Sequence, residues 1–245
     1  MNYRPVLNNI PPVVKNLIII NVLFFVADNI FALKGIRLSS YLGLYFPFSE
    51  NFRLHQIFTH MFMHGSLMHI FFNMFALYMF GRVLESVWGS KRFLIYFLIT
   101  GIGAALLHSF VNFLEYQSLA GKMSPETIDY VKTEGPRLWN EGKNFSDTLT
   151  GKLNMLLNIP TVGASGAVFG LLLAFGMLFP NTQLMLLFPP IPIKAKYFVM
   201  GYGAIELYLG FSHPGSNVAH FAHLGGMLFG YIMIKYWNKN SNKFY

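Results

Sequence analysis

Two residues in separate apolar stretches of this 245-residue chain could together perform acyl-transfer chemistry. Ser165 stands among glycines and alanines, and His223 stands just before the glycine pair 225–226. A serine hydroxyl becomes a strong nucleophile when a neighbouring base accepts its proton, and imidazole is well suited to that task near neutral pH. The two residues therefore predict a nucleophile and its general base, provided that the fold brings them together.

A third apolar stretch offers donors for the negative charge that such an attack creates. His69 and Asn73 are four residues apart, so they project from the same face of a helix. An oxyanion needs preorganised donors, and these two side chains and the Ser165 backbone N–H are the candidates. No aspartate is placed to orient His223, so the expected arrangement is a dyad.

The composition indicates that this chemistry takes place in a membrane. Hydrophobic residues make up 54% of the chain and charged residues only 11%, about half the share found in soluble domains. The net charge of +8 comes from scattered Lys and Arg residues without a basic run, which argues against nucleic acid as a partner. Cysteine is absent, which excludes disulfides, a thiolate metal site and a cysteine nucleophile.

Apolar runs of about 20 residues predict an all-α polytopic membrane protein that forms a single domain over 1–245. The first run lacks a small-x-small cleavage site and is therefore expected to be a retained span. The polar stretch 115–160 is expected to be an outer loop, in which 125–132 could form a short surface helix. The six predicted spans are 13–33, 66–86, 92–114, 161–179, 196–212 and 217–237.

Lysines and arginines near the span ends predict that both termini are cytoplasmic. One side of the membrane carries ten basic residues and one acid, whereas the other carries eight basic and seven acidic residues. Positive charge in short loops marks the cytoplasmic side. In this orientation the second, fourth and sixth spans enter from the outside, and their polar residues lie at a common depth in the outer third of the bilayer.

Small residues follow both reactive side chains. Gly166 and Gly170 form a GxxxG step after the serine, and Gly226 and Gly230 form another after the histidine. Small residues let helix backbones approach closely within a membrane. We therefore expect the fourth and sixth spans to pack tightly enough to bring the serine within reach of the histidine.

These strings closely resemble the rhomboid family of intramembrane serine proteases. His64–Asn73 matches the HxxxxHxxxN pattern of that family, and Gly163–Gly166 matches its GxSG motif. Ala222–Gly230 matches the AHxxGxxxG pattern, and Gly81–Gly89 matches a GxxxExxxG signature. The four motifs occur in order, each on the proper span, and the resemblance covers about 60–237.

The resemblance implies a six-helix rhomboid-like bundle that acts as a serine endopeptidase. It implies Ser165 as the nucleophile, and the glycine spacing selects His223, not His220, as the base. His69 and Asn73 would help to form the oxyanion hole. The implied partners are the bilayer and single-span transmembrane substrates, with no cofactor and no metal.

Supporting roles follow from the same resemblance. His64 would be a structural residue near the oxyanion hole, and Gly163 and Gly226 belong to the motifs that support the site. Phe169 occupies a place where some family members have a Tyr that stacks on the catalytic histidine. The aromatic face is retained here, but the hydroxyl is absent.

Two alternative functions belong to other classes. Several histidines near the outer face could bind or transport a metal, because imidazole suits zinc. Against this, the chain has no helical HExxH, no carboxylate is expected beside the histidines, and the serine would remain unexplained. A non-catalytic rhomboid-like binding or quality-control factor typically lacks the serine or the histidine, and this chain keeps both. The histidines that could bind a metal in the first alternative are His60, His64, His69, His220 and His223.

Three acids and the cellular location complete the expectations. Asp28 and Glu206, which lie inside spans, are expected to have structural or water-facing roles, and Glu85 is expected to hold a turn. The expected location is a bacterial cytoplasmic membrane, because no organelle-targeting segment is evident, and a eukaryotic membrane is the alternative. The oligomeric state does not follow from the sequence.

Overall fold

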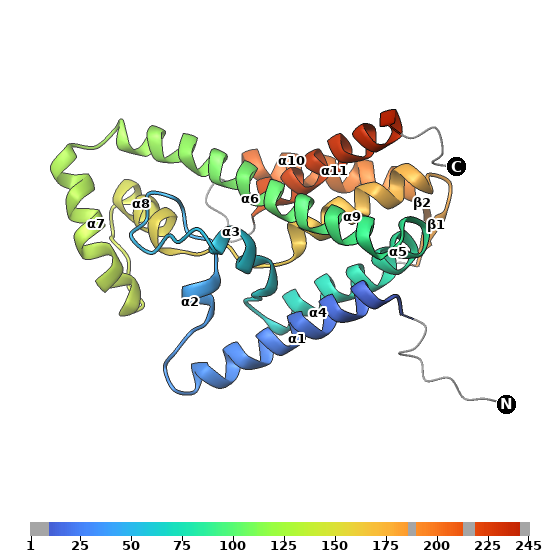
Figure 1. Ribbon diagram of the computed structural model, residues 1–245. Helices are drawn as coiled ribbons and strands as arrows, with labels where there is room; N and C mark the ends of the chain where they lie inside the picture. Colours follow the sequence, from blue (N-terminus) through green and yellow to red (C-terminus); the bar gives the residue numbers. More distant parts are fainter. Residues whose placement is uncertain (1–9, 186–189, 213–218, 241–245) are drawn as a thin grey trace.

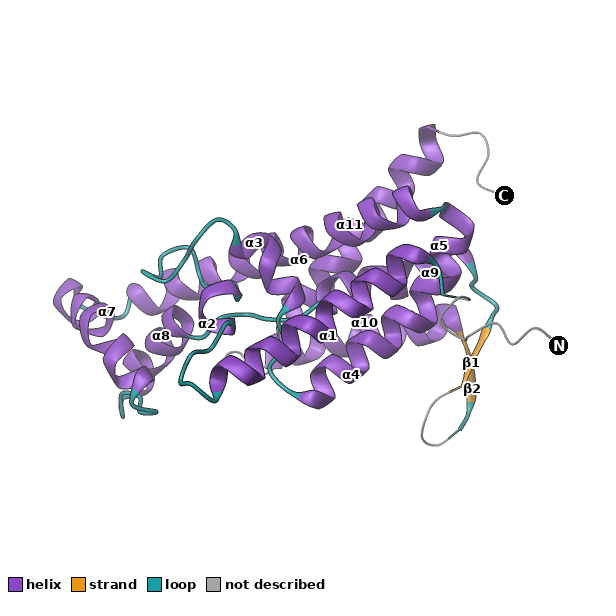
Figure 2. Cartoon of the chain, turned by 60° about the horizontal axis from the view of Figure 1, so that its bottom comes forward, coloured by secondary structure: helices purple, strands orange, loops and turns teal. Residues whose placement is uncertain are grey.

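Helices dominate the computed structural model, which describes residues 10–185, 190–212 and 219–240 (Figure 1). Most of the helices run side by side as one bundle, with α7 and α8 at one end and a two-stranded antiparallel hairpin at the other (Figures 1 and 2). The elements in chain order are α1 (Pro12–Ala32), α2 (Ser39–Leu42), α3 (Gln56–Thr59), η2 (His60–Phe62), α4 (Leu67–Ala76), the π-helical η3 (Leu77–Gly81), α5 (Arg82–Trp88), α6 (Ser90–Ala120), α7 (Pro125–Asn140), α8 (Thr148–Asn158), α9 (Ser165–Leu178), β1 (Gln183–Met185), β2 (Pro192–Lys194), α10 (Ala195–Ser212) and α11 (His220–Asn240).

Every predicted span coincides with helical structure. The first three correspond to α1, the continuous run Leu67–Trp88 and α6, and all three are long and apolar enough to cross a membrane. The last three correspond to α9, which is a shorter apolar helix, α10 and α11. The predicted all-α membrane bundle is therefore confirmed. Residues 217 and 218, at the start of the predicted sixth span, lie outside the described residues.

Helices α6, α9 and α11 form the centre of the bundle and touch through small residues. A Cβ added at Gly226 of α11 would collide with the backbone of Gly166 in α9, and one added at Gly166 would collide with Ala104 of α6. The Tyr96 hydroxyl of α6 donates a hydrogen bond of 2.9 Å to the carbonyl of Gly170 in α9. These contacts confirm that the glycine steps let the helix backbones approach closely.

Glu85 bonds the start of α1 as well as the turn that the sequence predicts it to hold. Its buried carboxylate accepts the backbone N–H groups of Val13 and Val14 at 3.0 and 2.8 Å, and the Ser90 hydroxyl at 2.6 Å. The first N–H groups of a helix have no partner within the helix. Glu85 therefore satisfies the start of α1 and ties it to the turn between α5 and α6.

The polar stretch 115–160 is mostly helical, whereas the sequence predicts a helix there only over 125–132. Helix α6 continues to Ala120, and α7 and α8 follow as a packed pair (Figure 1). Ser124 and Asp147 cap these two helices by accepting first-turn N–H groups. The hydrogen bond from the Thr150 N–H holds the pKa of the Asp147 carboxyl below its usual range.

A separate hydrophobic cluster joins the α7–α8 pair to the rest of the chain. Its buried members come from the loop before α3, the end of α6, α7 and α8: Phe46, Leu119, Val131, Leu153 and Leu157. Burial of apolar side chains is the main stabilising term in packing of this kind outside the bilayer. The pair is therefore held against the end of α6 and does not hang from it as an open loop.

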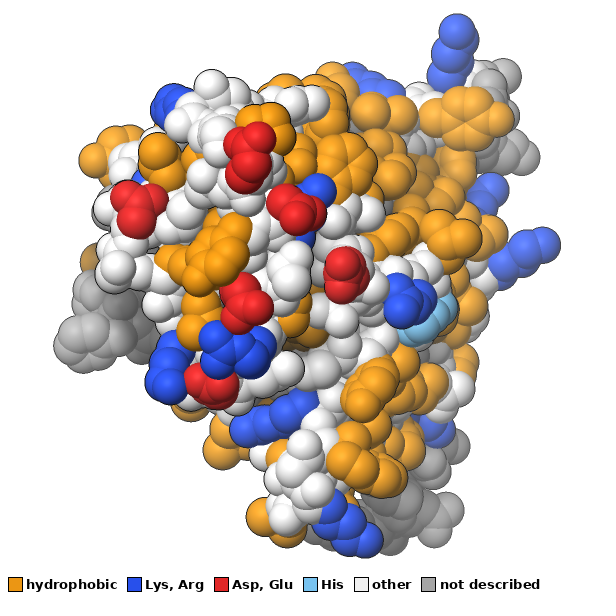
Figure 3. Space-filling model, turned by 90° about the vertical axis from the view of Figure 1, so that its left-hand side faces the viewer, with side chains coloured by type: hydrophobic (Ala, Val, Ile, Leu, Met, Phe, Trp, Pro, Cys, Tyr) orange, Lys and Arg blue, Asp and Glu red, His pale blue; other side chains and the backbone are white. Residues whose placement is uncertain are grey.

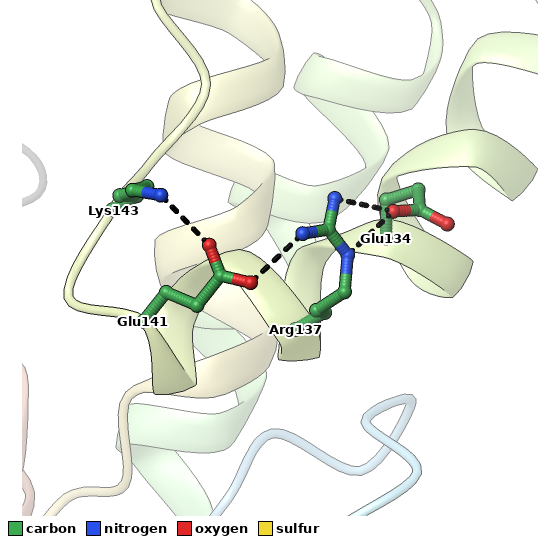
Figure 4. Close-up of polar contacts among 4 residues, drawn as sticks. All are labelled: Glu134, Arg137, Glu141 and Lys143. Carbon is green, nitrogen blue, oxygen red and sulfur yellow. Dashed lines mark hydrogen bonds and ion pairs between the residues drawn. The ribbon is translucent and has the colours of Figure 1, made fainter.

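The outer face of α7 is polar. Acidic and basic side chains gather on this end of the molecule (Figure 3). Arg137 donates hydrogen bonds to Glu134 at 2.9 Å and to Glu141 at 2.8 Å, and Lys143 donates to Glu141 at 2.9 Å (Figure 4). The hydrogen bonds from Lys143 and Arg137 hold the pKa of Glu141 below its usual range. Because these charged side chains are exposed, we interpret this face as a water-facing surface. Exposed ion pairs of this kind add little stability.

Both ends of the described chain lie at the same end of the bundle. The start of α1 and the end of α11 are on the side of β1 and β2, and α7 and α8 are at the far side (Figures 1 and 2). An N-terminus and a C-terminus on the same side of the membrane fit this arrangement.

Candidate active site

Ser165 and His223 meet where α9 and α11 begin. The His223 Nε2 atom lies 2.9 Å from the Ser165 Oγ atom. Ser165 is the first residue of α9, His223 lies in the first turn of α11, and the Gly166–Gly226 contact holds the two helix starts together. With Nε2 unprotonated, the serine hydroxyl donates to the imidazole, which is the arrangement of an activated nucleophile.

An aromatic ring fixes the plane of the histidine. The rings of Phe169 and His223 are parallel within 4°, and their centroids are 4.2 Å apart. Phe169 lies one turn after Ser165 on α9, so the same helix carries the nucleophile and the stacking surface. The aromatic face expected at Phe169 is therefore present against the imidazole.

Gly163 shapes the backbone just before the nucleophile. Its φ of +127° lies in a region that residues with a Cβ rarely adopt, and an added Cβ would lie only 2.7 Å from the His69 Nε2 atom. The Gly163 N–H donates to the carbonyl of His60 at 2.9 Å. The same Cβ position lies 3.6 Å from Ser165 Oγ, so Gly163 lets the His69 ring approach the serine.

The candidate oxyanion donors lie on α4. The Ser66 hydroxyl caps this helix by accepting the N–H of His69, which places His69 in the first turn. Asn73 is buried, and its side-chain amide donates one hydrogen bond of 3.0 Å to the His69 carbonyl. An amide nitrogen carries two hydrogens, so one donor is left for another acceptor.

His64 lies behind His69. Only 2% of its surface is exposed, and its ring meets the His69 ring edge-on with centroids 5.0 Å apart. We therefore interpret His64 as a packing residue that holds the His69 ring.

The structure places a carboxylate beside the histidines, where none is expected from the sequence. Glu206 Oε2 on α10 lies 2.7 Å from His220 Nδ1 and 3.0 Å from His223 Nδ1. The first contact is a hydrogen bond, and the second is a close approach without hydrogen-bond alignment. From the sequence, Glu206 is expected to have a structural or water-facing role, because nothing in the local spacing relates α10 to α11. An acid inside an apolar span was the available signal.

His108 is a second polar residue that the motifs do not contain. It lies on α6, its Nε2 atom is 2.9 Å from the Thr161 hydroxyl, and Asn112 one turn later contacts the same nitrogen at 3.3 Å. Thr161 also pairs with Leu44 as an isolated antiparallel bridge, which joins the approach to α9 to the first outer loop. His108 thus anchors the segment that leads to the candidate nucleophile.

One cavity of about 1730 Å³ connects these groups. The candidate nucleophile, base and oxyanion donors all line it, and it continues along the end of α6 to α8, where Lys122 and Lys152 line it. Spans two, four and six thus deliver their polar residues to one space, as their common depth predicts. Helix α8 forms part of its wall through Leu149, Lys152, Met155 and Leu156. The candidate residues lining it are His69, Asn73, Gly163, Ser165, Phe169 and His223.

One group in the described part of the chain has the donor set for a metal ion. The ligand atoms of Glu206, His220 and His223 lie within 4.8 Å of one another. Two imidazoles and one carboxylate form a set that zinc accepts in proteins. However, the 2.7 Å contact between the carboxylate and His220 is a hydrogen-bond length, which fits a shared proton better than a bridging ion.

Comparison with known proteins identifies the family. The family model for the rhomboid domain matches residues 51–239, most of the chain. The chain belongs to the rhomboid family. This rhomboid is 35% identical to "Rhomboid-like protein 11, chloroplastic" of Arabidopsis thaliana over 91 residues. The matched stretch covers 37% of the chain and 30% of that protein. It is 27% identical to "Rhomboid protein 1, mitochondrial" of Saccharomyces cerevisiae over 182 residues. That match covers 74% of the chain and 41% of the yeast protein. The matches span less than half the length of either relative.

Proposed function

We propose that this rhomboid is an intramembrane serine endopeptidase that hydrolyses peptide bonds in or near transmembrane segments of other membrane proteins. The observation that carries the proposal is the 2.9 Å contact between Ser165 Oγ and His223 Nε2, made within a cavity inside a membrane protein. Family membership supports the same chemistry.

The proposed reaction has two steps. Ser165 Oγ attacks the peptide carbonyl carbon as His223 Nε2 takes the hydroxyl proton, and the carbonyl oxygen becomes an oxyanion. The intermediate collapses, the C–N bond breaks, and His223 gives its proton to the leaving amine. Water then attacks the acyl-enzyme with the same base, which releases the acid and restores the serine hydroxyl.

The oxyanion would be held by three donors. The Ser165 N–H is free of an intrahelical acceptor because the residue begins α9. The His69 ring and the second amide hydrogen of Asn73 come from α4, on another wall of the cavity. Donors of this kind act strongly where water is largely excluded.

The proposed substrate is a single-span helix with small, helix-weakening residues near its outer end. A stable helix hides its carbonyls in internal hydrogen bonds, whereas a weakened one can unwind and present an extended peptide to Ser165. We propose a bacterial cytoplasmic membrane as the location, with both termini cytoplasmic. The distribution of positive charge and the shared end of α1 and α11 support this orientation.

Purified protein in detergent, mixed with a transmembrane reporter substrate, tests the proposal. We expect cleavage that continues in the presence of a chelator and stops after treatment with a fluorophosphonate probe. Mass spectrometry should find the probe on the peptide that contains Ser165. Cleavage that a chelator abolishes would favour the metal-dependent alternative. A folded protein that neither cleaves nor reacts with the probe would favour a non-catalytic binding role.

Replacing Asn73 by Ala should lower kcat about 10- to 100-fold with little change in KM. Removing one oxyanion donor typically costs about 100- to 1,000-fold, and the His69 ring and the Ser165 N–H would remain here. Steady-state kinetics on the reporter measure the effect. The matched control is Asn29→Ala, because Asn29 on α1 makes the same side-chain bond to the carbonyl four residues earlier but lies exposed outside the cavity. Equal losses in the two variants would contradict the oxyanion role.

A further inference from the structure

A continuous chain of polar contacts passes from the candidate nucleophile to an acid on a third helix. Ser165 Oγ contacts one nitrogen of the His223 ring at 2.9 Å, and Glu206 Oε2 lies 3.0 Å from the other nitrogen of that ring. The three groups come from α9, α11 and α10. The sequence of serine, imidazole and carboxylate is that of a catalytic triad, although no acid belongs to the motifs by which the site was predicted.

Burial makes the position of Glu206 consequential. Only 7% of Glu206 is exposed, and His220 and His223 are 8% and 9% exposed. A buried carboxylate without partners is costly, so an acid held in this place needs hydrogen-bond donors. Within the described ranges, its ion-pair partners are the two imidazoles.

The two contacts differ in quality, and this divides the roles of the histidines. The shorter contact, 2.7 Å to His220 Nδ1, is a well-formed hydrogen bond and fixes the carboxylate. The contact to His223 Nδ1 is short but poorly aligned, and that nitrogen has no other partner within the described ranges. His220 therefore anchors Glu206, and the Glu206 carboxylate lies beside Nδ1 of His223.

A carboxylate at Nδ1 determines what Nε2 can do. When the Nδ1 proton faces Glu206, the Nε2 lone pair faces Ser165 and can accept the hydroxyl proton. Once His223 has taken that proton, the negative charge of Glu206 stabilises the imidazolium without itself becoming protonated. The alternative tautomer would place a proton between His223 and Ser165 and leave no base.

We propose that Glu206 is a positioning residue for the general base His223, and that His220 anchors Glu206 in turn. This inference rests on the proposed protease function. Phe169 and Glu206 would then fix the imidazole together, one through the ring plane and the other through the tautomer.

The test compares kcat and KM of Glu206→Gln, Glu206→Asp and wild type on the reporter, with a chelator in every assay so that no metal at this cluster contributes. We expect Glu206→Gln to lower kcat about 10- to 100-fold and to leave KM within about twofold. Loss of the corresponding charge in serine proteases costs about 10,000-fold, and the less aligned contact here predicts a smaller effect. Glu206→Asp, which keeps the charge, should recover part of the lost kcat.

Two substitutions of His220 test its role as the anchor of Glu206. Asn offers a donor near the place of the histidine Nδ1, so His220→Asn should retain more of kcat than His220→Ala. This ranking also decides the question if the Glu206 variants fail to fold: a higher kcat for His220→Asn supports the anchor, and equal kcat for the two variants overturns it.

A matched control is available in α1. Asp28 is buried, with 4% of its surface exposed, and accepts the backbone N–H of Ser39 at 3.1 Å, away from the cavity. Asp28→Asn removes a buried charge but should leave kcat at the wild-type value. A wild-type kcat in Glu206→Gln, or an equal fall in Asp28→Asn, overturns the positioning role. If wild type cleaves the reporter and Ser165→Ala does not, such a result leaves the protease function intact; if Ser165→Ala cleaves like wild type, the protease proposal itself has failed.

Discussion

Replacing Ser165 or His223 by Ala should lower cleavage of a transmembrane reporter at least about 10,000-fold. The expectation follows from the 2.9 Å contact between the two side chains, because neither can perform its step without the other. Residues that act as a unit are strongly non-additive. The double variant should therefore be no slower than either single variant, which rate measurements over long incubations can determine.

The control for this pair is Ser86→Ala, which removes an exposed serine of α5 whose hydroxyl bonds only the carbonyl of Arg82 among the hydrogen bonds described for it. This variant should cleave at the wild-type rate. Cleavage that survives Ser165→Ala would mean that another group, or another protein in the preparation, breaks the bond. Additive losses in the double variant would mean that the two residues act separately.

The candidate catalytic pair could be predicted because its signals are local. The motifs GxSG and AHxxGxxxG each contain a reactive residue and the small residues that let its helix approach another helix. The contact of Gly166 with Gly226 is the result of that close approach. Long apolar runs similarly determine which segments are spans, since the bilayer leaves few alternatives to helices. Both kinds of information lie within about ten to twenty residues of sequence.

The contacts of Glu206 and Glu85 could not be predicted in the same way. Glu206 meets His220 and His223 because of how α10 is rotated against α11, and Glu85 meets the start of α1 across 71 and 72 residues. Helix rotation is decided by side-chain packing along the whole interface, so no short motif records it. The sequence showed only that an acid in a span needs a partner.

The α7–α8 pair is a different case, because its signals were present in the sequence. Ser124-Pro125-Glu126 has an N-cap residue, a proline at the first helical position and an acid in the first turn, which is a strong helix start. Asp147 before Thr148 is a second such start. The sequence predicts only the first part of α7, over 125–132, because polar composition gives no sign of a span. The rest of α7 and all of α8 bury their apolar face against the first outer loop and the end of α6, and not within the bilayer.

A single methyl group at Gly226 should separate the nucleophile from its base. An added Cβ would lie far closer to the Gly166 carbonyl oxygen and carbonyl carbon than van der Waals contact allows, and both are backbone atoms that no rotamer change can move away. Helices α9 and α11 would have to move apart by about 1 Å or more. Misplacement on that scale costs about 100-fold in rate, and overpacking of a core typically costs about 1–3 kcal/mol.

Gly226→Ala should therefore lower kcat at least about 100-fold and also lower the melting temperature in detergent, although both residues of the candidate catalytic pair are retained. Gly201→Ala is the matched control, because Gly201 lies inside the neighbouring helix α10 and nothing lies within 4 Å of an added Cβ. That variant should keep both the rate and the melting temperature. Wild-type cleavage by Gly226→Ala would show that the helices tolerate the separation, and the 2.9 Å contact would then not be set by the glycine step. Reaction of Ser165 with a fluorophosphonate probe separates the two effects: a folded Gly226→Ala protein that labels slowly has lost its base, whereas one that labels at the wild-type rate has not.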